Sequence, residues 1–167
     1  AAKPATGPDS VWIGVMKRDL RFRLSFEAFN PATRAEAEKK LGEILDDFQK
    51  RGERVLVGFD FPLGFPRGLA KALALPGDLP WRAVWDQLDK MVKDKADNTN
   101  NRFGVGSEIN RRLTGGPFPF WGCPPKDALT TLQPKRTRAH GPDDLPEFRH
   151  ADLAAKGAAS IWKLYYN

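Results

Sequence analysis

The sequence predicts an α/β fold in which a mixed sheet opens with an antiparallel hairpin and carries helices packed on it. Two short apolar runs, 11–16 and 20–26, are separated by three polar residues, which is the spacing of a hairpin. An amphipathic segment follows them, and a third apolar run occupies residues 54–61. A hairpin, a helix and a buried strand in this order are typical of a sheet with a helix on one face.

The hairpin leads into a helix whose start is well marked. Within 20–26 apolar residues alternate with polar ones, which predicts one strand face on a core and one in water. Asn30 then offers a capping side chain, Pro31 suits the first helical position, and Thr33 lies close behind. A single apolar stripe follows, and Gly52 indicates the end of the helix.

The third predicted strand, 54–61, is almost wholly apolar from Val55 to Phe59, as expected when both faces of a strand are covered. Pro62 prevents the strand from continuing, so Asp60 stands at its edge. A carboxylate at such an edge loses much of its water and needs a cation, a hydrogen-bond donor or a raised pKa. We therefore expect chemistry at Asp60; the alternative is that it hydrogen-bonds the backbone of the following turn.

The second half of the sequence is mainly helical in pattern. Residues 68–75 predict a short helix, and Pro80 begins a stronger one whose apolar stripe includes Trp81 and Trp85. Because these tryptophans share the aliphatic face, we expect them in the core and not in a base-stacking platform. After a polar break, residues 105–113 keep helical spacing up to two glycines.

The last third has weaker signals. Residues 117–146 are rich in proline, glycine and charge, which predicts a long irregular stretch. Residues 147–158 predict a small helix, and 160–167 end the sequence on aromatic residues. We find no internal repeat and no linker, and therefore interpret 1–167 as a single domain.

Composition narrows the classes of protein. The single cysteine excludes an internal disulfide and a Cys-rich zinc site, and two histidines leave a hard, oxygen-bound ion as the expected metal. No apolar run is long enough for a membrane span, so we expect a cytoplasmic protein. The formal charge of +6 modestly favours polyanions, although solubility alone explains it equally well. Glycine-rich phosphate loops and common hydrolase motifs are absent.

Two further groups of residues could carry chemistry. From Glu108, Arg111 and Arg112 lie at i+3 and i+4, which predicts either a surface ion-pair cluster or a metal-binding Glu108 beside an arginine phosphate clamp. The second group is a basic segment at residues 135–138. It either contacts phosphate or is a merely solvated loop. His150 becomes a candidate general base only where the fold places it beside a substrate. The basic segment contains Lys135, Arg136 and Arg138.

The sequence GFDFPLG at residues 58–64 resembles a motif of the DUF429-like proteins, a bacterial group assigned to the ribonuclease H-like fold and predicted to be nucleases. Residues 1–4 resemble the stretch just after that group's first acidic strand, and 102–112 resemble its arginine and acid helix. Arg149 together with residues 160–164 resembles its late tryptophan motif.

The resemblance implies a metal-dependent phosphodiester hydrolase acting on nucleic acid or another phosphorylated substrate. Asp60 and Glu108 are then the catalytic and metal-binding carboxylates, with Mg²⁺ or Mn²⁺ as the ion. Arg111, Arg112 and the basic segment at 135–138 bind the polyanion, so binding weakens steeply with salt.

The resemblance also exposes a departure, because the leading acidic residue of that fold lies on its first strand. No acid precedes Asp9 here, so we expect that first strand to lie outside these 167 residues. The sequence also ends abruptly at residues 165–167, without a polar tail, and we expect part of the C-terminal region to lie outside as well. Two alternatives stay open: a noncatalytic binding or assembly domain in which Asp60 caps a turn, and a small-molecule phosphotransferase of related fold. The oligomeric state is not predicted.

Overall fold

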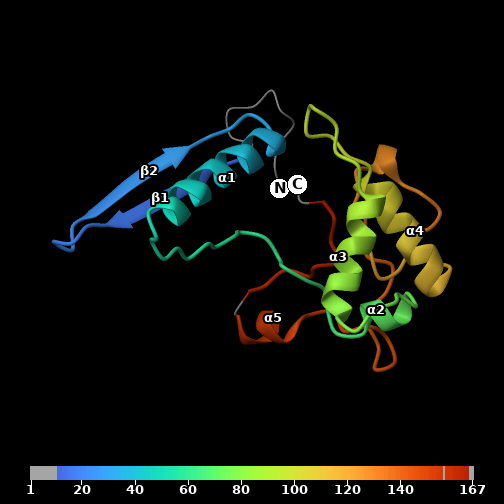
Figure 1. Cartoon of the computed structure of the whole chain (residues 1–167). Helices are drawn as coiled ribbons and strands as arrows, with labels where there is room; N and C mark the ends of the chain where they lie inside the picture. The colour runs from blue at the N-terminus through green and yellow to red at the C-terminus, as the bar shows by residue number, and fades with distance from the viewer. Residues whose placement is uncertain (1–10, 156, 166–167) are drawn as a thin grey trace. The chain divides into compact units, whose positions relative to one another are not determined.

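The computed structural model describes residues 11–155 and 157–165, and they belong to two compact units. Unit 1 contains the residues up to Gly58 together with Asp94–Asn100, and unit 2 contains Phe59–Lys93 and the residues from Asn101 onward. The elements occur in the following order: β1 (Ile13–Arg18), β2 (Leu24–Phe29), α1 (Arg34–Lys50), α2 (Leu69–Ala72), α3 (Pro80–Met91), α4 (Arg102–Thr114), the 3₁₀ turn η1 (Pro125–Asp127) and α5 (His150–Ala154) (Figure 1).

The predicted hairpin is confirmed, with β1 antiparallel to β2 and Ile13 opposite Phe29. Its turn is longer than expected, because the Asp19 carboxylate accepts hydrogen bonds from the backbone N–H groups of Arg21 (2.8 Å) and Arg23 (2.9 Å). An aspartate that binds its own turn in this way favours a wider loop. β2 therefore begins at residue 24 and not at 20.

Helix α1 lies along one face of the hairpin, where the Lys40 ammonium is 4.5 Å from the ring centroid of Phe29 (Figure 1). The other face is open. Met16 is 67% exposed, and Leu24 and Phe26 are each 66% exposed. The alternating pattern of residues 20–26 was expected to place Leu24 and Phe26 on a core, and that prediction is wrong because no described residues cover this face.

The start of α1 is set by Thr33 and not by the expected Asn30. The Thr33 hydroxyl accepts a hydrogen bond from the backbone N–H of Glu36 (3.1 Å), and the Glu36 carboxylate accepts one from the N–H of Ala32 (3.0 Å). Thr33 is thus the N-cap residue, and the two bonds together satisfy two backbone donors at the start of the helix. The helix consequently begins at Arg34.

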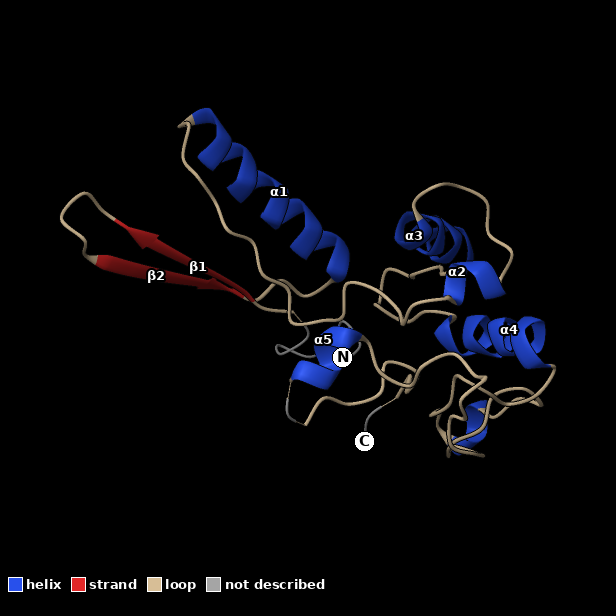
Figure 2. Cartoon of the chain, turned by 90° about the horizontal axis from the view of Figure 1, so that it is seen from below, coloured by secondary structure: helices blue, strands red, loops and turns tan. Residues whose placement is uncertain are grey.

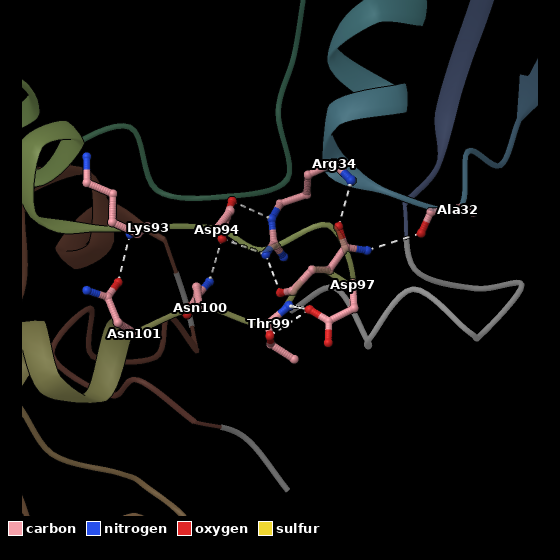
Figure 3. Close-up of polar contacts among 9 residues, drawn as sticks. Ala32, Arg34, Lys93, Asp94, Asp97, Thr99, Asn100 and Asn101 are labelled. Atoms are coloured by element: carbon pink, nitrogen blue, oxygen red, sulfur yellow. Dashed lines mark hydrogen bonds and ion pairs between the residues drawn. The ribbon is translucent and has the colours of Figure 1, made fainter.

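The loop 94–100, which connects α3 to α4, holds the first turn of α1 (Figure 3). The Arg34 guanidinium donates two hydrogen bonds to the Asp94 carboxylate (2.9 and 2.7 Å) and one to the backbone oxygen of Asn98. The Asn98 amide accepts from the N–H of Arg34 (2.8 Å) and donates to the oxygen of Ala32 (3.1 Å). Unit 1 is therefore assembled from two separate stretches of sequence.

The apolar run at 54–61 forms no strand, and Figure 2 draws it as loop. Val55, Leu56 and Val57 are 44%, 98% and 41% exposed. The described sheet has two strands, so the predicted buried strand and the mixed sheet are wrong for this part of the chain. A strand is stable only when its backbone pairs with a neighbour, and among the described residues none pairs with this run.

The main core lies in unit 2, where α2, α3 and α4 surround a buried cluster that includes Trp162 and Leu132, both 0% exposed. The buried Asn110 of α4 donates to the backbone oxygens of Phe120 (2.8 Å) and Thr131 (2.7 Å) and accepts from the N–H of Phe120 (2.8 Å). These bonds fix the irregular stretch 117–146 to α4. The long irregular region predicted from sequence is confirmed, and it is well packed.

The helix predictions in unit 2 hold. Helix α3 begins with Pro80 at its first position, and α4 ends at Thr114 with Gly115 as its C-terminal cap, in the left-handed conformation (φ 72°). Helices α2 and α5 fall within the predicted segments 68–75 and 147–158. No described helix has both the length and the apolar character needed to cross a bilayer.

Candidate functional site

Asp60 lies in an exposed bend and makes no hydrogen bond or ion pair with any other described residue. The expectation that it loses its water at a strand edge is wrong, because the strand does not form. The alternative, in which Asp60 bonds the backbone of the next turn, is also not observed among the described residues. Its carboxylate is free to meet a ligand.

The turn that follows Asp60 is anchored by side chains of unit 2. The indole N–H of Trp85 donates to the backbone oxygen of Leu63 (3.1 Å), and the Arg149 guanidinium donates to that of Gly64 (3.4 Å). The next ring along the chain, at residue 65, packs against the buried core. The free carboxylate thus stands beside a backbone that is held in place.

Arg149 is itself fixed by Asp152 on α5. Its Nε and Nη2 atoms donate to the two carboxylate oxygens at 2.8 and 2.6 Å, and its backbone N–H donates to one of them at 2.9 Å. The hydrogen bonds from Arg149 hold the pKa of Asp152 below its usual value. Asp152 is 9% exposed, so this ion pair is largely shielded from water and positions the anchoring guanidinium.

Glu108 and Arg111, both predicted site residues on α4, bind each other. The guanidinium donates two hydrogen bonds of 2.7 Å to the carboxylate, and these lower the pKa of Glu108. Arg112 instead donates to the backbone oxygen of Leu73 (3.1 Å). The surface ion pair foreseen as one alternative is therefore present, and no described hydrogen bond or ion pair joins Glu108 to Asp60.

Two arginines of the basic segment are paired with acids. Arg136 donates to the Glu147 carboxylate at 2.8 Å, and Arg138 forms a bidentate pair with Asp144. The Arg138 guanidinium holds the pKa of Asp144 well below its usual range. Lys135 is exposed and has no partner among the described residues. Of this segment, Lys135 alone presents an unpaired charge.

Arg67 is a cation that the sequence analysis did not single out. It lines a pocket of about 280 Å³ together with Thr114, Asp143 and Leu145, and it makes no hydrogen bond or ion pair with other described residues. The available signal was its position directly after the Phe-Pro pair that ends the anchored turn. An unpaired guanidinium at this place suits an anionic ligand.

Trp81 and Trp85 are on the surface, being 52% and 43% exposed, which corrects the expectation that they are core residues. Val84 between them is 6% exposed and faces the core. Successive helical residues are turned by about 100°, so Trp85 is rotated well away from Val84. The tryptophans therefore stand at the rim of the apolar stripe and not at its centre.

The described residues contain no group of three or more His, Cys, Asp or Glu side chains that could hold a metal ion. His150 is exposed on α5, while the Nδ1 of His140 lies 2.7 Å from the backbone oxygen of Leu145. The metal assignment to Asp60 and Glu108 stays a prediction.

Comparison with protein families, curated proteins and solved structures gave no match to this chain.

Proposed function

We propose that this chain is a metal-dependent phosphodiester hydrolase of ribonuclease H-like character that acts on nucleic acid. The observation that carries the proposal is the exposed, unpaired carboxylate of Asp60 beside a turn that Trp85 and Arg149 hold at two consecutive carbonyl groups. A catalytic metal site needs a coordinating side chain, here that of Asp60, whose backbone is fixed before the substrate arrives. The resemblance of residues 58–64 to the DUF429-like motif supports the same assignment.

The metal of this proposal is a hard divalent ion held by carboxylates. Magnesium is commonly held by one or two carboxylates and retains several waters, so Asp60 with Glu108 provides an adequate protein share. Such an ion orients a water molecule and offsets charge on the scissile phosphate. Glu108 now pairs with Arg111 on the surface, and exposed pairs are weak enough to be exchanged for an ion. Arg67 is then available to bind the substrate phosphate.

A melting experiment tests the metal site. Titration of MgCl₂ or MnCl₂ raises the melting temperature of the wild type, and saturation at a hundredfold excess over Kd corresponds to about 2.7 kcal/mol. The Asp60→Asn variant shows no such rise, because it has lost the charged ligand. Asp78→Asn, an exposed change in the same unit, retains it.

Cleavage of a labelled oligonucleotide is expected to follow the same order: the wild type and Asp78→Asn cleave it in the presence of metal, and Asp60→Asn does not. An identical response of wild type and Asp60→Asn to both metals contradicts the assignment of Asp60. Glu108→Gln separates the second ligand from the first, since its loss weakens metal binding without removing the site.

A second candidate function is a noncatalytic binding or assembly domain, and the open apolar face of the β1–β2 hairpin favours it. A face of this kind is usually covered by a partner. The expected result under this alternative is concentration-dependent association in analytical ultracentrifugation, together with no metal response in any variant. Met16→Lys, on the open face, then abolishes the association.

A further inference from the structure

Two pairs of exposed aromatic side chains lie in unit 2 near Asp60. The ring centroids of Trp81 and Trp85 are 5.5 Å apart, and those of Phe59 and Phe61 are 4.9 Å apart. These four rings, which we call the aromatic patch, are each between 43% and 59% exposed. Large rings in water are unfavourable, so a group of four on one unit indicates a binding surface.

Chain geometry keeps the two pairs close to each other and to the carboxylate. The indole of Trp85 contacts the backbone oxygen of Leu63 at 3.1 Å. Consecutive Cα atoms are about 3.8 Å apart, so Phe61 lies at most about 8 Å from Leu63 and Asp60 at most about 11 Å. The aromatic patch therefore lies within a few nucleotides' length of the proposed metal ligand.

The charge of unit 2 matches a polyanion. Unit 2 contains 15 of the lysines and arginines and 10 of the aspartates and glutamates, which gives it a formal charge of +5, whereas unit 1 carries +1. Arg67 and Lys71 are exposed close to the anchored turn and have no ion-pair partner among the described residues. Exposed aromatic rings within a basic unit are the combination that single-stranded nucleic acid requires, because each unpaired base offers a flat face to a ring.

We propose that the aromatic patch stacks the bases of single-stranded nucleic acid and so presents the strand to Asp60. This inference rests on the proposed function and adds the substrate class to it. Bases inside a duplex already stack on one another, so duplex nucleic acid lacks free faces for Trp81 and Trp85. The single strand is therefore preferred over the duplex of the same sequence.

The test measures binding without metal, so that it is independent of hydrolysis. Fluorescence anisotropy of a labelled twelve-nucleotide oligothymidylate, in EDTA, follows the affinity of the wild type and the variants. Trp81→Ala is the main variant, because its ring makes no described polar contact and its removal takes no hydrogen bond from the anchored turn. Loss of one stacked base is expected to weaken binding roughly 5- to 150-fold, while Trp81→Phe keeps a ring and loses less.

Two controls isolate stacking from general effects. Leu153→Ala removes an exposed apolar side chain of the same unit, 71% exposed on α5, and is expected to bind as the wild type does. Trp85→Phe keeps an aromatic ring but removes the hydrogen bond to Leu63. A large loss of affinity in this variant therefore shows that binding depends on the anchored turn. Circular dichroism confirms that each variant is folded.

The outcomes separate this inference from the proposed function. Tight single-strand binding that Trp81→Ala weakens supports stacking, whether or not metal binds at Asp60. Equal affinity of wild type and Trp81→Ala, equal binding of single strand and duplex, or self-association that Trp81→Ala abolishes overturns it. Metal-dependent cleavage with any of these three results leaves the hydrolase proposal standing and the stacking surface refuted.

Discussion

Units 1 and 2 differ in how far they bury the apolar residues that the sequence provides. In unit 2 the side chains of Trp162, Leu132 and Ile109 are at most 2% exposed. In unit 1 the buried hydrophobic residues that the structure describes are Ala37 and Phe48, both at 8%. An amphipathic pattern therefore predicts which face is apolar, but burial depends on an element that covers it.

The difference has an energetic consequence. A two-stranded hairpin is marginal in isolation, and α1 covers only one face of this one, whereas the helices of unit 2 share a continuous core with the segments around Phe120 and Trp162. We expect unit 2 to carry most of the stability of the chain.

The largest effect expected from this comparison concerns two tryptophans. Trp162 is fully buried, and its indole donates to the backbone oxygen of Pro146 at 3.0 Å. Trp162→Ala should lower the free energy of unfolding by roughly 3–5 kcal/mol, measured by urea denaturation. Trp12→Ala, at 61% exposure in unit 1, should change it by less than about 0.5 kcal/mol. A comparable cost at Trp12 would mean that the open hairpin face is covered in solution.

A smaller effect is expected where the loop 94–100 holds α1. Asn98→Ala removes hydrogen bonds to the N–H of Arg34 and the oxygen of Ala32, and should destabilise unit 1 by about 1–2 kcal/mol. Hydrogen exchange of the first-turn amides of α1 should accelerate, while that of α4 stays unchanged. Thr99→Ala, which affects bonds only to Asp97, serves as the control. Equal acceleration in both helices would show that the two units unfold together.

The smallest effect is a dependence of stability on pH. The folded-state pKa of Asp152 lies below the ordinary value of 3.8, because Arg149 donates hydrogen bonds to it. The stabilisation is therefore fully present above about pH 3.8 and is lost as the pH falls through the folded pKa. Asp152→Asn should be less stable than the wild type at pH 7, and the difference in melting temperature should shrink on acidification. A difference that grows towards low pH would contradict this sign.

The sequence predicted the elements whose signals are local. Pro80 at the start of α3 and Gly115 at the end of α4 act through their own backbone preferences, so these helices were predicted well. The run 54–61 was predicted wrongly, because a strand also depends on a partner that its own residues cannot specify. Asn30 and Thr33 are both good caps, but the Asn30 side chain donates to the backbone oxygen of Val11, while the Thr33 hydroxyl accepts from the N–H of Glu36 and so caps the helix.

The candidate site was predicted in part. The chemical types at residues 60, 108 and 111 indicated carboxylates and cations, but the pairing of Glu108 with Arg111 depends on side-chain geometry that spacing allows without selecting. Arg67 and the exposed position of Trp81 were missed, because both follow from which part of a helix or turn the core leaves uncovered.

The bonds between Arg34 and the loop at Asp94 have a practical consequence for dissecting the molecule. Because unit 1 takes residues from both sides of α2 and α3, no single cut in the polypeptide yields both units intact. A fragment ending at Gly58 lacks the Asp94 acceptor of Arg34, and a fragment starting at Phe59 carries Asp94 but lacks Arg34. Mixing the two fragments should restore the ion pair between Arg34 and Asp94. Fragment complementation is therefore the way to measure the folding of one unit apart from the other.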